Sequence, residues 1–517
     1  MTTIDRTSPV PIYHQLRQYI EKQIRQGLWG PGDRIPTERE LCRAHGISRS
    51  PVRQALNELA HEGLLVRKPG LGTFVTSDVS RGTVSKTTIR IMHSDPHWSA
   101  TLDRISSEWN GQHPDRPIAF DVEFVPHARL YDRLSAAVGD GTAPDLAVVD
   151  SVWVAGLADA GFLHALGDGG SAADHPTCWE GLYPDSVQAN SFEGLLYGLP
   201  VKADASLLWY RKDWFAQEGL TPPQRWDELV NNALHFVRPD IRERYGLDHP
   251  LAFPGGTAGG EATVYTLLPL IWSAGGDVID ANSKCITLNR PETADGLRFV
   301  RELTQKYRVT APEVVDYPPG TSSRLLAEGR VAMALGGSYQ ARLIQSLGQW
   351  SEADFSQHVG ATPPPAPRGR HQVSTVGGSS YVLLRQCKCP ALTMDMLRVA
   401  TDVSVIGDLY RSKWFNLPSL SFNETLNPET EPLLGQIAEM IASGRARPSI
   451  AQYVQVSRPL QMMFERAISG TEPIEDITQD TARIISVITN LACQAALLPG
   501  RRTAATDSAS SDSRSCA

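Results

Sequence analysis

The sequence predicts a multidomain protein in which a small N-terminal α+β unit precedes a larger α/β body. A chain of 517 residues is too long for a single hydrophobic core. Its charge is divided unevenly: residues 1–82 hold 12 Lys and Arg against 8 Asp and Glu, a net of +4, although the whole chain carries −8. Strand-like and helix-like segments alternate from about residue 88 onward, which is typical of a largely parallel sheet covered by helices.

Composition excludes several classes of protein. No run of about 18 apolar residues is present, so the sequence predicts no transmembrane helix and no membrane partner. The N-terminal stretch "MTTIDRTSPVPIYHQLRQYIEK" lacks the apolar core of a signal peptide, which predicts a cytoplasmic location. The seven cysteines are dispersed, and the pair in "CKC" has no second pair or nearby histidine. We therefore expect reduced thiols, no metal site and no cofactor.

The N-terminal unit begins with an expected helix over residues 12–26. Its apolar residues recur at helical spacing and share one face: Ile12, Leu16, Tyr19, Ile20 and Ile24. The stretch "GLWGPGDRIP" ends this helix, because glycine and proline are costly in a helix interior. A second helix begins at "TERE", where Thr37 and Glu40 have the spacing of a capping box. We expect Leu41 and Ala44 of this helix to face inward.

A third helix completes a helix-turn-helix pattern. Gly46 forms the turn, since glycine adopts backbone conformations that other residues resist, and Ser48 caps the third helix. The buried stripe of this helix is Val52, Ala55, Leu56 and Leu59. Its opposite side and N-terminal end carry polar and basic side chains: Arg49, Ser50, Arg53 and Gln54. Such a helix fits the major groove of B-DNA, where its N-terminal side chains reach base edges.

The stretch "LLVRKPGLGTFV" predicts a two-strand hairpin, in which Gly70 and Gly72 let the backbone approach a phosphate or a groove wall. The alternative is a small helical domain with a solvated basic face. Any one arginine taken alone would favour this alternative. The ordered set of capped helix, glycine turn, arginine-bearing helix and Gly-x-Gly hairpin favours a DNA-binding module instead.

In this order of motifs, residues 9–76 closely resemble the winged helix-turn-helix of the gluconate-repressor (GntR) family of bacterial transcription regulators, and we expect a DNA-binding domain over residues 1–76. The residues that the resemblance implies in DNA binding are Arg39 on the second helix, Ser48, Arg49, Ser50 and Arg53 at the recognition helix, and Gly70 and Gly72 at the wing tip. The resemblance also implies that the protein binds palindromic, double-stranded operator DNA as a homodimer, which agrees with the geometry of paired half-sites.

The body follows a polar stretch at residues 77–87 that predicts a linker. Beyond it, "TIRIMH", "IAFDVEFV" and "PDLAVVD" are strand-like and the segments between them are helix-like, which predicts an α/β unit. The alternation continues to about residue 390, after which helical periodicity dominates. The tail at residues 499–517 is small and polar with nothing to bury, which predicts disorder.

Several stretches of the body, taken in order, resemble the family 1 extracellular solute-binding proteins, the group that includes maltose-binding protein. They are "APDLAVVDSVWVAGLADAGFLHAL", "YGLPVKADASLLWYRKDWFAQEGLTPPQRWDEL", "PLIWSAGGDVID", "RLLAEGRVAMALGGSYQ" and "VGGSSYVLL". The resemblance covers about residues 88–495. It implies a two-lobe α/β fold of the type II periplasmic-binding-protein kind, with a cleft between the lobes. We therefore expect a sensor domain over residues 88–498 that includes C-terminal helices.

The same resemblance places the crossings between the lobes near Gly198–Pro200 and Gly377–Ser379. Lobe 1 is then expected at about residues 88–199 together with a return segment after 380, and lobe 2 at about 202–376. A ligand closes such lobes only by binding the closed form more tightly than the open one.

A site for a sugar needs aromatic platforms for the ring faces and carboxylates or amides for the hydroxyls. Motif by motif, the resemblance implies nine ligand-binding candidates: His93, Asp95, Asp150, Trp153, Asp204, Tyr265, Tyr339, Gly378 and Ser379. Tyr339 stands where the family often has tryptophan, which changes the area available for stacking. Trp98 and Trp272 are expected in the core, because a tryptophan in an α/β domain is more often a core residue than a ligand platform.

These features predict a ligand-responsive bacterial transcription regulator whose partners are operator DNA and a small-molecule effector, with a carbohydrate as the preferred effector. Several alternatives stay open: a body that senses a non-sugar ligand or serves only for dimerisation, and, less favoured, an exported solute receptor or an enzyme. No H-E-x-x-H, G-x-S-x-G or Walker motif is present, so we expect no catalytic residues. The stretch "GGTAGGE" (Gly255–Glu261) lacks the Lys-Ser/Thr of a P-loop and predicts a flexible loop at the edge of the cleft.

Overall fold

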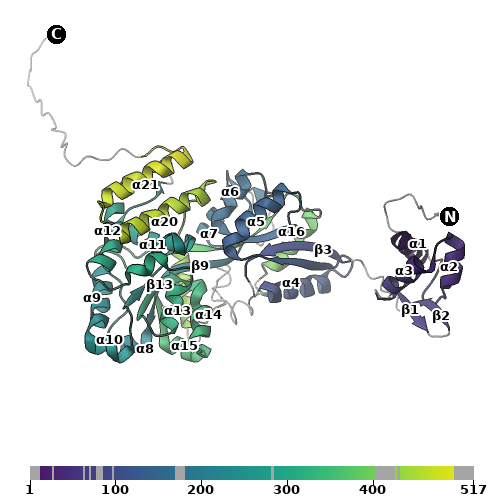
Figure 1. The fold of residues 1–517 in the computed structure, drawn as a ribbon, viewed down its shortest axis with the longest axis horizontal. Helices are drawn as coiled ribbons and strands as arrows, with labels where there is room; N and C mark the ends of the chain where they lie inside the picture. Colours follow the sequence, from purple (N-terminus) through teal and green to yellow (C-terminus); the bar gives the residue numbers. More distant parts are fainter. Residues whose placement is uncertain are drawn as a thin grey trace, which may run out of the picture. The chain divides into compact units, whose positions relative to one another are not determined.

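The computed structural model describes most of the chain between Ile12 and Cys493. The described residues are 12–25, 28–61, 64–68, 71–76, 86–95, 98–168, 181–280, 284–402, 404–405, 407, 425–427 and 431–493. The predicted wing residue Gly70, most of the predicted linker and the predicted disordered tail lie outside these ranges. The chain divides into two compact units, one of which holds residues up to Thr88 together with Asn110–Ala119, and the other the remainder (Figure 1).

The N-terminal domain consists of three helices and a hairpin. They are α1 (Ile12–Arg25), α2 (Glu38–His45), α3 (Arg49–His61), β1 (Leu65–Lys68) and β2 (Gly72–Val75). The two strands pair antiparallel with Leu65 opposite Val75, and Arg34 adds a bridge to Phe74. Apolar side chains from all of these elements form one core: Leu16, Ile20, Ile35, Leu41, Ile47, Val52, Ala55, Leu56, Leu59, Leu65 and Val75.

Local capping signals fix both ends of α2. The Thr37 side chain accepts a hydrogen bond from the Glu40 backbone N–H at 3.3 Å, and the Glu40 carboxylate accepts one from the Thr37 N–H at 2.7 Å. This pair confirms the predicted capping box. Gly46 ends the helix at φ 64°, in the left-handed region that favours glycine. Leu41 is buried as expected, but the expectation for Ala44 is wrong, because Ala44 is exposed.

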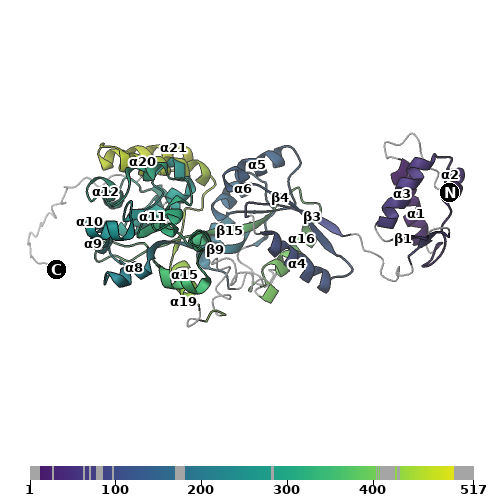
Figure 2. The same ribbon diagram turned by 60° about the horizontal axis from the view of Figure 1, so that its bottom comes forward.

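The first lobe of the body carries helices on both faces of a sheet. Its strands are β3 (Thr87–His93), β4 (Ile118–Phe124), β5 (Leu146–Asp150) and β15 (Thr375–Leu383), with a small sheet of β6 (Gly167–Asp168), β7 (Ser191–Phe192) and β8 (Leu195–Leu196). Its helices are α4 (Trp98–Gln112), α5 (His127–Gly139), α6 (Val154–Asp159), α7 (Pro184–Ala189) and α16 (Pro390–Ala400). Helices α5 and α6 lie on one side of the sheet and α4 on the other (Figure 1, Figure 2).

The second lobe has its own sheet and a larger set of helices. Its strands are β10 (Leu251–Ala252), β13 (Met333–Gly337) and β14 (Val359–Thr362), with a small hairpin of β11 (Ile279–Asp280) and β12 (Cys285–Ile286). Its helices are α8 (Lys212–Gln217), α9 (Trp226–Val237), α10 (Pro239–Tyr245), α11 (Glu261–Ala274), α12 (Pro291–Gln305), α13 (Thr321–Ala327), α14 (Ala341–Leu347) and α15 (Glu352–His358). Its buried apolar side chains form a cluster separate from that of the first lobe, as two lobes require.

Strand β9 (Gly198–Arg211) runs through both lobes. Up to Ala205 it pairs antiparallel with β15, and from Ser206 it pairs antiparallel with β13. The exchange of partners lies beyond Gly198–Pro200, where the sequence places the crossing. The sheet is mixed and not largely parallel as expected, because β9 runs antiparallel to β13 and β15, and β15 runs antiparallel to β5. The strand is buried over 13 of its 14 residues, so no exposed break marks the change of lobe.

The last described segment returns to the junction of the lobes and then covers the second one. It holds α19 (Pro432–Ala442), β16 (Arg445–Ala446), α20 (Tyr453–Ser469) and α21 (Ile474–Thr489). Strand β16 pairs with β15 at Thr375 and Val376, while α20 and α21 pack on α11 and α12 and add side chains such as Phe464 to the second core. None of the helices in the described ranges is both long enough and apolar enough to cross a membrane.

Candidate functional site

The N-terminal domain presents one polar side of α3 to solvent. Its stripe of Val52, Ala55, Leu56 and Leu59 is at most 1% exposed, which fixes the orientation of the helix. The predicted recognition residues consequently face outward: Ser48, Arg49, Ser50 and Arg53 are all exposed, as is Arg39 on α2. An exposed helix N-terminus with two arginines is suited to the major groove, since the arginine fork matches guanine O6 and N7.

One carboxylate links the recognition helix to the hairpin. Glu38 at the start of α2 lies 3.4 Å from Arg53 Nη2 and 3.8 Å from Arg67 Nη2. Gly72 opens β2 at φ 127°, and a Cβ there would lie 2.8 Å from the Arg34 Nε. The base of the predicted wing therefore requires glycine at this position for both backbone and space.

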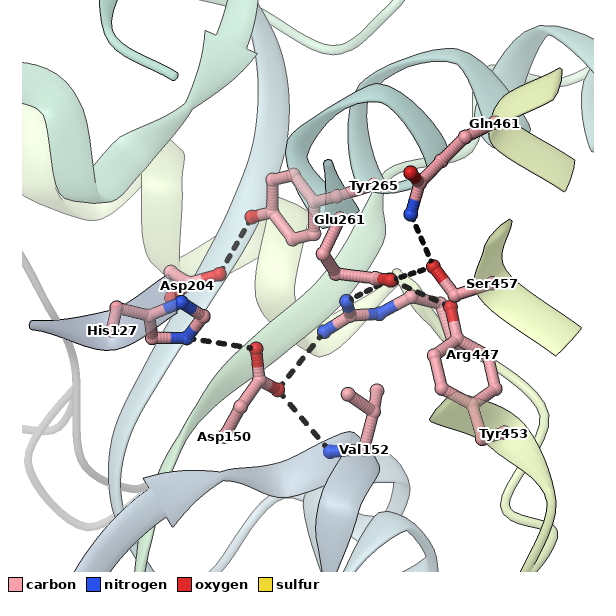
Figure 3. Close-up of polar contacts among 10 residues, drawn as sticks. All are labelled: His127, Asp150, Val152, Asp204, Glu261, Tyr265, Arg447, Tyr453, Ser457 and Gln461. Carbon is pink, nitrogen blue, oxygen red and sulfur yellow. Dashed lines mark hydrogen bonds and ion pairs between the residues drawn. The ribbon is translucent and has the colours of Figure 1, made fainter. Parts of the chain in front are cut away.

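In the body, Arg447 lies between the two lobes. Its side chain is 2% exposed and pairs with both sides: Nη1 lies 2.6 Å from Glu261 Oε1, at the start of α11 in the second lobe, and Nη2 lies 3.4 Å from Asp150 Oδ1, at the end of β5 in the first (Figure 3). We call Asp150, Glu261, Arg447, Asp204 and Tyr265 the junction cluster. Burial of a guanidinium is tolerated only when such partners satisfy it.

Besides Arg447, two hydroxyl groups donate to Glu261, and a third side chain supports one of them. The Tyr453 hydroxyl donates to its Oε1 at 2.6 Å, and the Ser457 hydroxyl donates to Oε2, while Gln461 in turn donates to Ser457 at 2.8 Å (Figure 3). All three residues lie on α20. The stretch Gly255–Glu261, expected as a flexible loop at the cleft edge, is instead packed, with Gly255 and Gly256 buried; a Cβ at Gly256 would lie 2.4 Å from the Val315 carbonyl oxygen.

Asp150 is oriented by contacts on both of its oxygens. The Val152 N–H donates to Oδ1 at 3.2 Å, as at a helix N-terminus, and His127 Nε2 lies 3.8 Å from Oδ2. Burial alone would raise the pKa of Asp150, but the charge of Arg447 and the contact with His127 hold it below its usual range. In return, although burial lowers the pKa of His127, the bond to Asp150 and its charge raise it overall. Asp150 is therefore an ionised acceptor.

Asp204 on β9 has a different environment. It accepts a hydrogen bond from the Tyr265 hydroxyl at 2.6 Å (Figure 3) and is 9% exposed. Burial raises the pKa of Asp204 to about 6, although the bond from Tyr265 opposes the shift. A Cβ at Gly377 would lie 2.8 Å from Asp204 Oδ1 and 2.9 Å from Tyr265 Cε2. Only glycine in β15 therefore lets this carboxyl group reach the junction.

Aromatic rings flank the junction cluster. Trp153 is partly buried, with ring centroids 4.9 Å from His127 and 5.5 Å from Tyr131. On the other lobe, Tyr339 is 41% exposed and meets the Tyr265 ring edge-on at 5.9 Å. Rings beside carboxylates can cover a sugar face while the carboxylates accept from its hydroxyls.

A second ion pair lies two residues before Asp204 on β9. Lys202 pairs with Asp95, and its ammonium group lies 4.6 Å from the centroid of the Trp98 ring. Trp98 is 1% and Trp272 6% exposed, so both are core residues as expected. His93 is 3% exposed and its ring meets the Phe124 ring edge-on at 6.1 Å, within the first lobe. Burial lowers the pKa of His93.

Most of the predicted ligand residues come together. Five of them, Asp150, Trp153, Asp204, Tyr265 and Tyr339, lie in or beside the junction cluster. Ser379 lies opposite Asp150 and Gly378 opposite Ala203 in the strand register. His93 lies beside Phe124, and Asp95 pairs with Lys202, whose charge acts on Asp204.

Sequence reasoning missed Arg447, Glu261 and His127. Glu261 opens a helix after a glycine-rich stretch, a position that favours a carboxylate, so a signal was present. Arg447 has none, because its partners Glu261 and Asp150 lie 186 and 297 residues away along the chain. Among the described residues, no group of three or more His, Cys, Asp or Glu side chains is arranged to hold a metal ion.

Comparison with protein families assigns both parts of the chain. Residues 12–75 match the family described as bacterial regulatory proteins, gntR family, and residues 96–402 match the bacterial extracellular solute-binding proteins. Neither family is a family of enzymes. The resemblances expected for the N-terminal unit and for the body are thereby confirmed.

Curated relatives match a short part of the chain. The histidine utilization repressor of Klebsiella aerogenes is 50% identical over 70 residues, which are 14% of this chain and 29% of that protein. The transcriptional repressor NagR of Bacillus subtilis is 48% identical over 73 residues, 14% of this chain and 30% of that protein. The chain thus spans about 30% of the length of these relatives.

Solved structures match the body. A solute-binding protein of Thermotoga lettingae bound with alpha-D-tagatose aligns with a TM-score of 0.66 and 23% identity, covering 78% of this chain and 100% of that one. Maltose-bound MalE3 of T. maritima aligns with a TM-score of 0.65 and 23% identity, covering 78% and 99%. Identity at this level establishes the fold and confirms the predicted fold class. The chain therefore belongs to the bacterial extracellular solute-binding protein family and carries at residues 12–75 a DNA-binding region of the gntR family.

Proposed function

We propose that this protein is a cytoplasmic, ligand-responsive transcription regulator. The N-terminal domain binds operator DNA, and the body binds a small molecule, for which a carbohydrate is our first choice. The observation that carries the proposal is the union, in one chain, of an exposed arginine-bearing recognition helix with a two-lobe solute-binding body. No enzymatic step is required, since binding energy alone can couple the two parts.

The DNA half of the proposal rests on Arg39, Ser48, Arg49, Ser50 and Arg53. Their exposure beside a buried helical stripe supports contact with bases and phosphates, and Gly70 and Gly72 are proposed at the wing tip. One helix-turn-helix reads one half-site, so a homodimer on a palindromic operator supplies a complete site.

The ligand half rests on the junction cluster and its flanking rings. Asp150 and Asp204 offer acceptors for hydroxyl groups, and Trp153 and Tyr339 offer ring faces, a combination that suits a sugar. Structural neighbours of the body are described with tagatose and with maltose bound. His93, Asp95, Tyr265, Gly378 and Ser379 are proposed to line or support the same site.

Thermal unfolding of the full-length protein against a panel of mono- and oligosaccharides tests the ligand half. A ligand at about 100 times its Kd stabilises the native state by about 2.7 kcal/mol. For a domain of about 150–250 residues this raises Tm by about 5–10 °C. The Trp153→Ala variant, compared with its own ligand-free Tm, is expected to lose most of the shift. Absence of a shift with every saccharide would contradict the carbohydrate assignment and favour a non-sugar ligand or a body that serves only for dimerisation.

Selection of duplex DNA from a random pool with the full-length protein tests the DNA half. Recovery of a palindromic consensus that binds as one dimer per duplex is the expected result. Recovery of no consensus, with affinity that depends on salt alone, would contradict sequence-specific binding, because phosphate contacts carry no sequence information.

A further inference from the structure

Arg447 lies outside the stretch that matches the solute-binding family, residues 96–402. It directly follows β16, a short strand paired to β15 at the point where the chain passes between the lobes. From there its side chain reaches one carboxylate on each lobe, with Glu261 at 2.6 Å and Asp150 at 3.4 Å (Figure 3). A movement that separates the lobes must therefore break at least one of these ion pairs.

Neither carboxylate is free to follow the guanidinium. Glu261 is anchored to α20 through Tyr453 and Ser457, and α20 packs on the second lobe. Asp150 is anchored to the first lobe by the Val152 N–H at 3.2 Å. The rings of Tyr265 and Tyr453, with centroids 5.3 and 6.0 Å from the guanidinium carbon, further confine Arg447. The three charged groups thus have one mutual arrangement when the lobes are together.

The exposures of these groups decide which of them can meet a ligand. The Arg447 side chain is 2% exposed, whereas those of Asp150 and Glu261 are 16% and 20% exposed. The cation therefore lies behind the carboxylates. Asp150 uses Oδ1 for Arg447 and Val152, while its Oδ2 has the more distant contact with His127 at 3.8 Å. This leaves Oδ2 as the oxygen best placed to accept from a ligand hydroxyl.

We infer that Arg447 is a positioning residue that ties the two lobes together and orients Asp150 for the ligand. Without the cation, two carboxylates from opposite lobes would face each other in a poorly solvated place, and their repulsion would favour separation of the lobes. The C-terminal segment is then part of the sensor, because it supplies the charge on which the closed arrangement depends. The orientation of Asp150 for a ligand rests on the proposed function, but the tie between the lobes does not.

Hydrogen–deuterium exchange of the ligand-free, full-length protein tests the tie. In the Arg447→Gln variant, backbone amides on the two faces of the junction, in residues 150–154 and 257–263, are expected to exchange at least tenfold faster than in the wild type. Amides in β13 and α12, inside the second core, are expected to keep their rates. Equal acceleration everywhere would overturn the inference, because it would mean that Arg447 only stabilises the fold, and so would unchanged rates at the junction.

Arg445→Gln is the matched control. Arg445 precedes Arg447 by two residues, pairs with Asp277 of the second lobe at 2.5 Å and lies over the Trp272 ring at 4.8 Å. Its partners Asp277 and Trp272 lie in the second lobe, and its charge also acts on Asp185 of α7 in the first lobe. None of these three residues belongs to the junction cluster, so the junction amides are expected to keep wild-type rates. If Arg445→Gln opens the junction as much as Arg447→Gln does, loss of any nearby charge is sufficient and the inference fails.

Two further variants keep the test readable if Arg447→Gln does not fold. Arg447→Lys retains the charge without the fork and is expected to show an intermediate acceleration. Glu261→Gln removes the second-lobe partner and is expected to accelerate the same two segments. If a saccharide effector is found, Arg447→Gln is expected to raise its Kd at least tenfold and Arg445→Gln to leave it unchanged. A protein that binds no saccharide would end the carbohydrate proposal while the exchange experiment still decides the tie.

Discussion

Asp204 illustrates how burial sets the behaviour of a single residue of the junction. Its pKa is raised to about 6 from the ordinary 3.8, mainly by burial, so the folded protein holds the Asp204 proton more tightly than the unfolded chain does. The stability that this proton contributes is fully present below the unfolded pKa and is lost as the pH rises through about 6. At pH 8 the buried carboxylate costs about 3 kcal/mol at most, since one pKa unit is about 1.4 kcal/mol.

The Asp204→Asn variant follows from this sign. Asparagine has no charge to bury and can still accept from Tyr265, so the variant is expected to unfold at a higher temperature than the wild type at pH 8. At pH 5 the wild-type carboxyl group is largely protonated in the folded protein but ionised in the unfolded chain, so the difference in melting temperature is expected to be about half of that at pH 8. Thermal melts at both pH values measure the difference. A gap of equal size at pH 5 and pH 8 would show that the pKa of Asp204 is not raised.

Arg53 is the residue of the N-terminal domain whose loss is most informative. Its side chain is 62% exposed, with Glu38 as a partner at 3.4 Å. The Arg53→Ala variant is expected to lose about 1–3 kcal/mol of operator binding, because the fork is proposed to read a base. The salt dependence of binding is expected to stay close to that of the wild type, since a base contact neutralises no phosphate. Fluorescence anisotropy at several salt concentrations measures both.

The control for Arg53 is Arg298→Ala on α12 of the body, whose exposed side chain pairs with Asp295 and Glu475. Its removal is expected to leave operator affinity unchanged. An equal loss of affinity in both variants would indicate that net charge, and not contact by the recognition helix, controls binding.

Among the elements, β9 and β15 pair closely because one position of β15 is a glycine. Gly378 in β15 has φ 141°, and a Cβ there would lie 1.8 Å from the Lys202 carbonyl oxygen. Only glycine adopts this backbone conformation without strain, and the strain alone is worth about 1–3 kcal/mol. The close approach of the two strands brings Asp204, on β9, to the junction.

Gly378→Ala is therefore expected to destabilise the body by at least this amount. Gly435→Ala in α19 is the matched control, because nothing lies within 4 Å of a Cβ built at Gly435, and alanine is expected to stabilise a helix interior by about 0.5–1 kcal/mol. Urea unfolding of the three proteins separates the outcomes. Equal stabilities for Gly378→Ala and the wild type would contradict the strand contact described above.

The same elements show which parts of the structure local sequence signals could predict. Thr37, Glu40 and Gly46 act on their immediate neighbours, and the capping box and turn are found where expected. No local signal predicts where β9 exchanges partners, because Ala205 and Ser206 are both buried in one continuous strand. Arg447 could not be predicted at all, since its role depends on carboxylates that only the folded chain brings near. Of the junction cluster, Asp150, Asp204 and Tyr265 were thus predicted, whereas the cation Arg447 and its partner Glu261 were not.

In the whole molecule, ligand binding to the body must be coupled to operator binding by the N-terminal domain. A ligand that binds the closed body more tightly than the open one shifts the population of closed bodies. If closed and open bodies place the two N-terminal domains of a dimer differently, operator affinity changes by a factor set by the coupling free energy, about 5–150-fold for about 1–3 kcal/mol. By linkage, operator DNA must change the affinity for the ligand by the same factor.

Whether ligand binding to the body changes operator binding is tested most directly by measuring the operator affinity of the full-length protein with and without the saccharide that raises its Tm. We expect the operator Kd to change by about 5–150-fold at saturating saccharide, and the saccharide Kd to change by the same factor when operator DNA is present. We also expect the Asp150→Asn variant, in which the ligand site is weakened and the recognition helix is intact, to need more saccharide for the same change in operator affinity. An operator Kd that stays the same at saturating saccharide would contradict this coupling, because the body would then bind its ligand without any change in DNA binding.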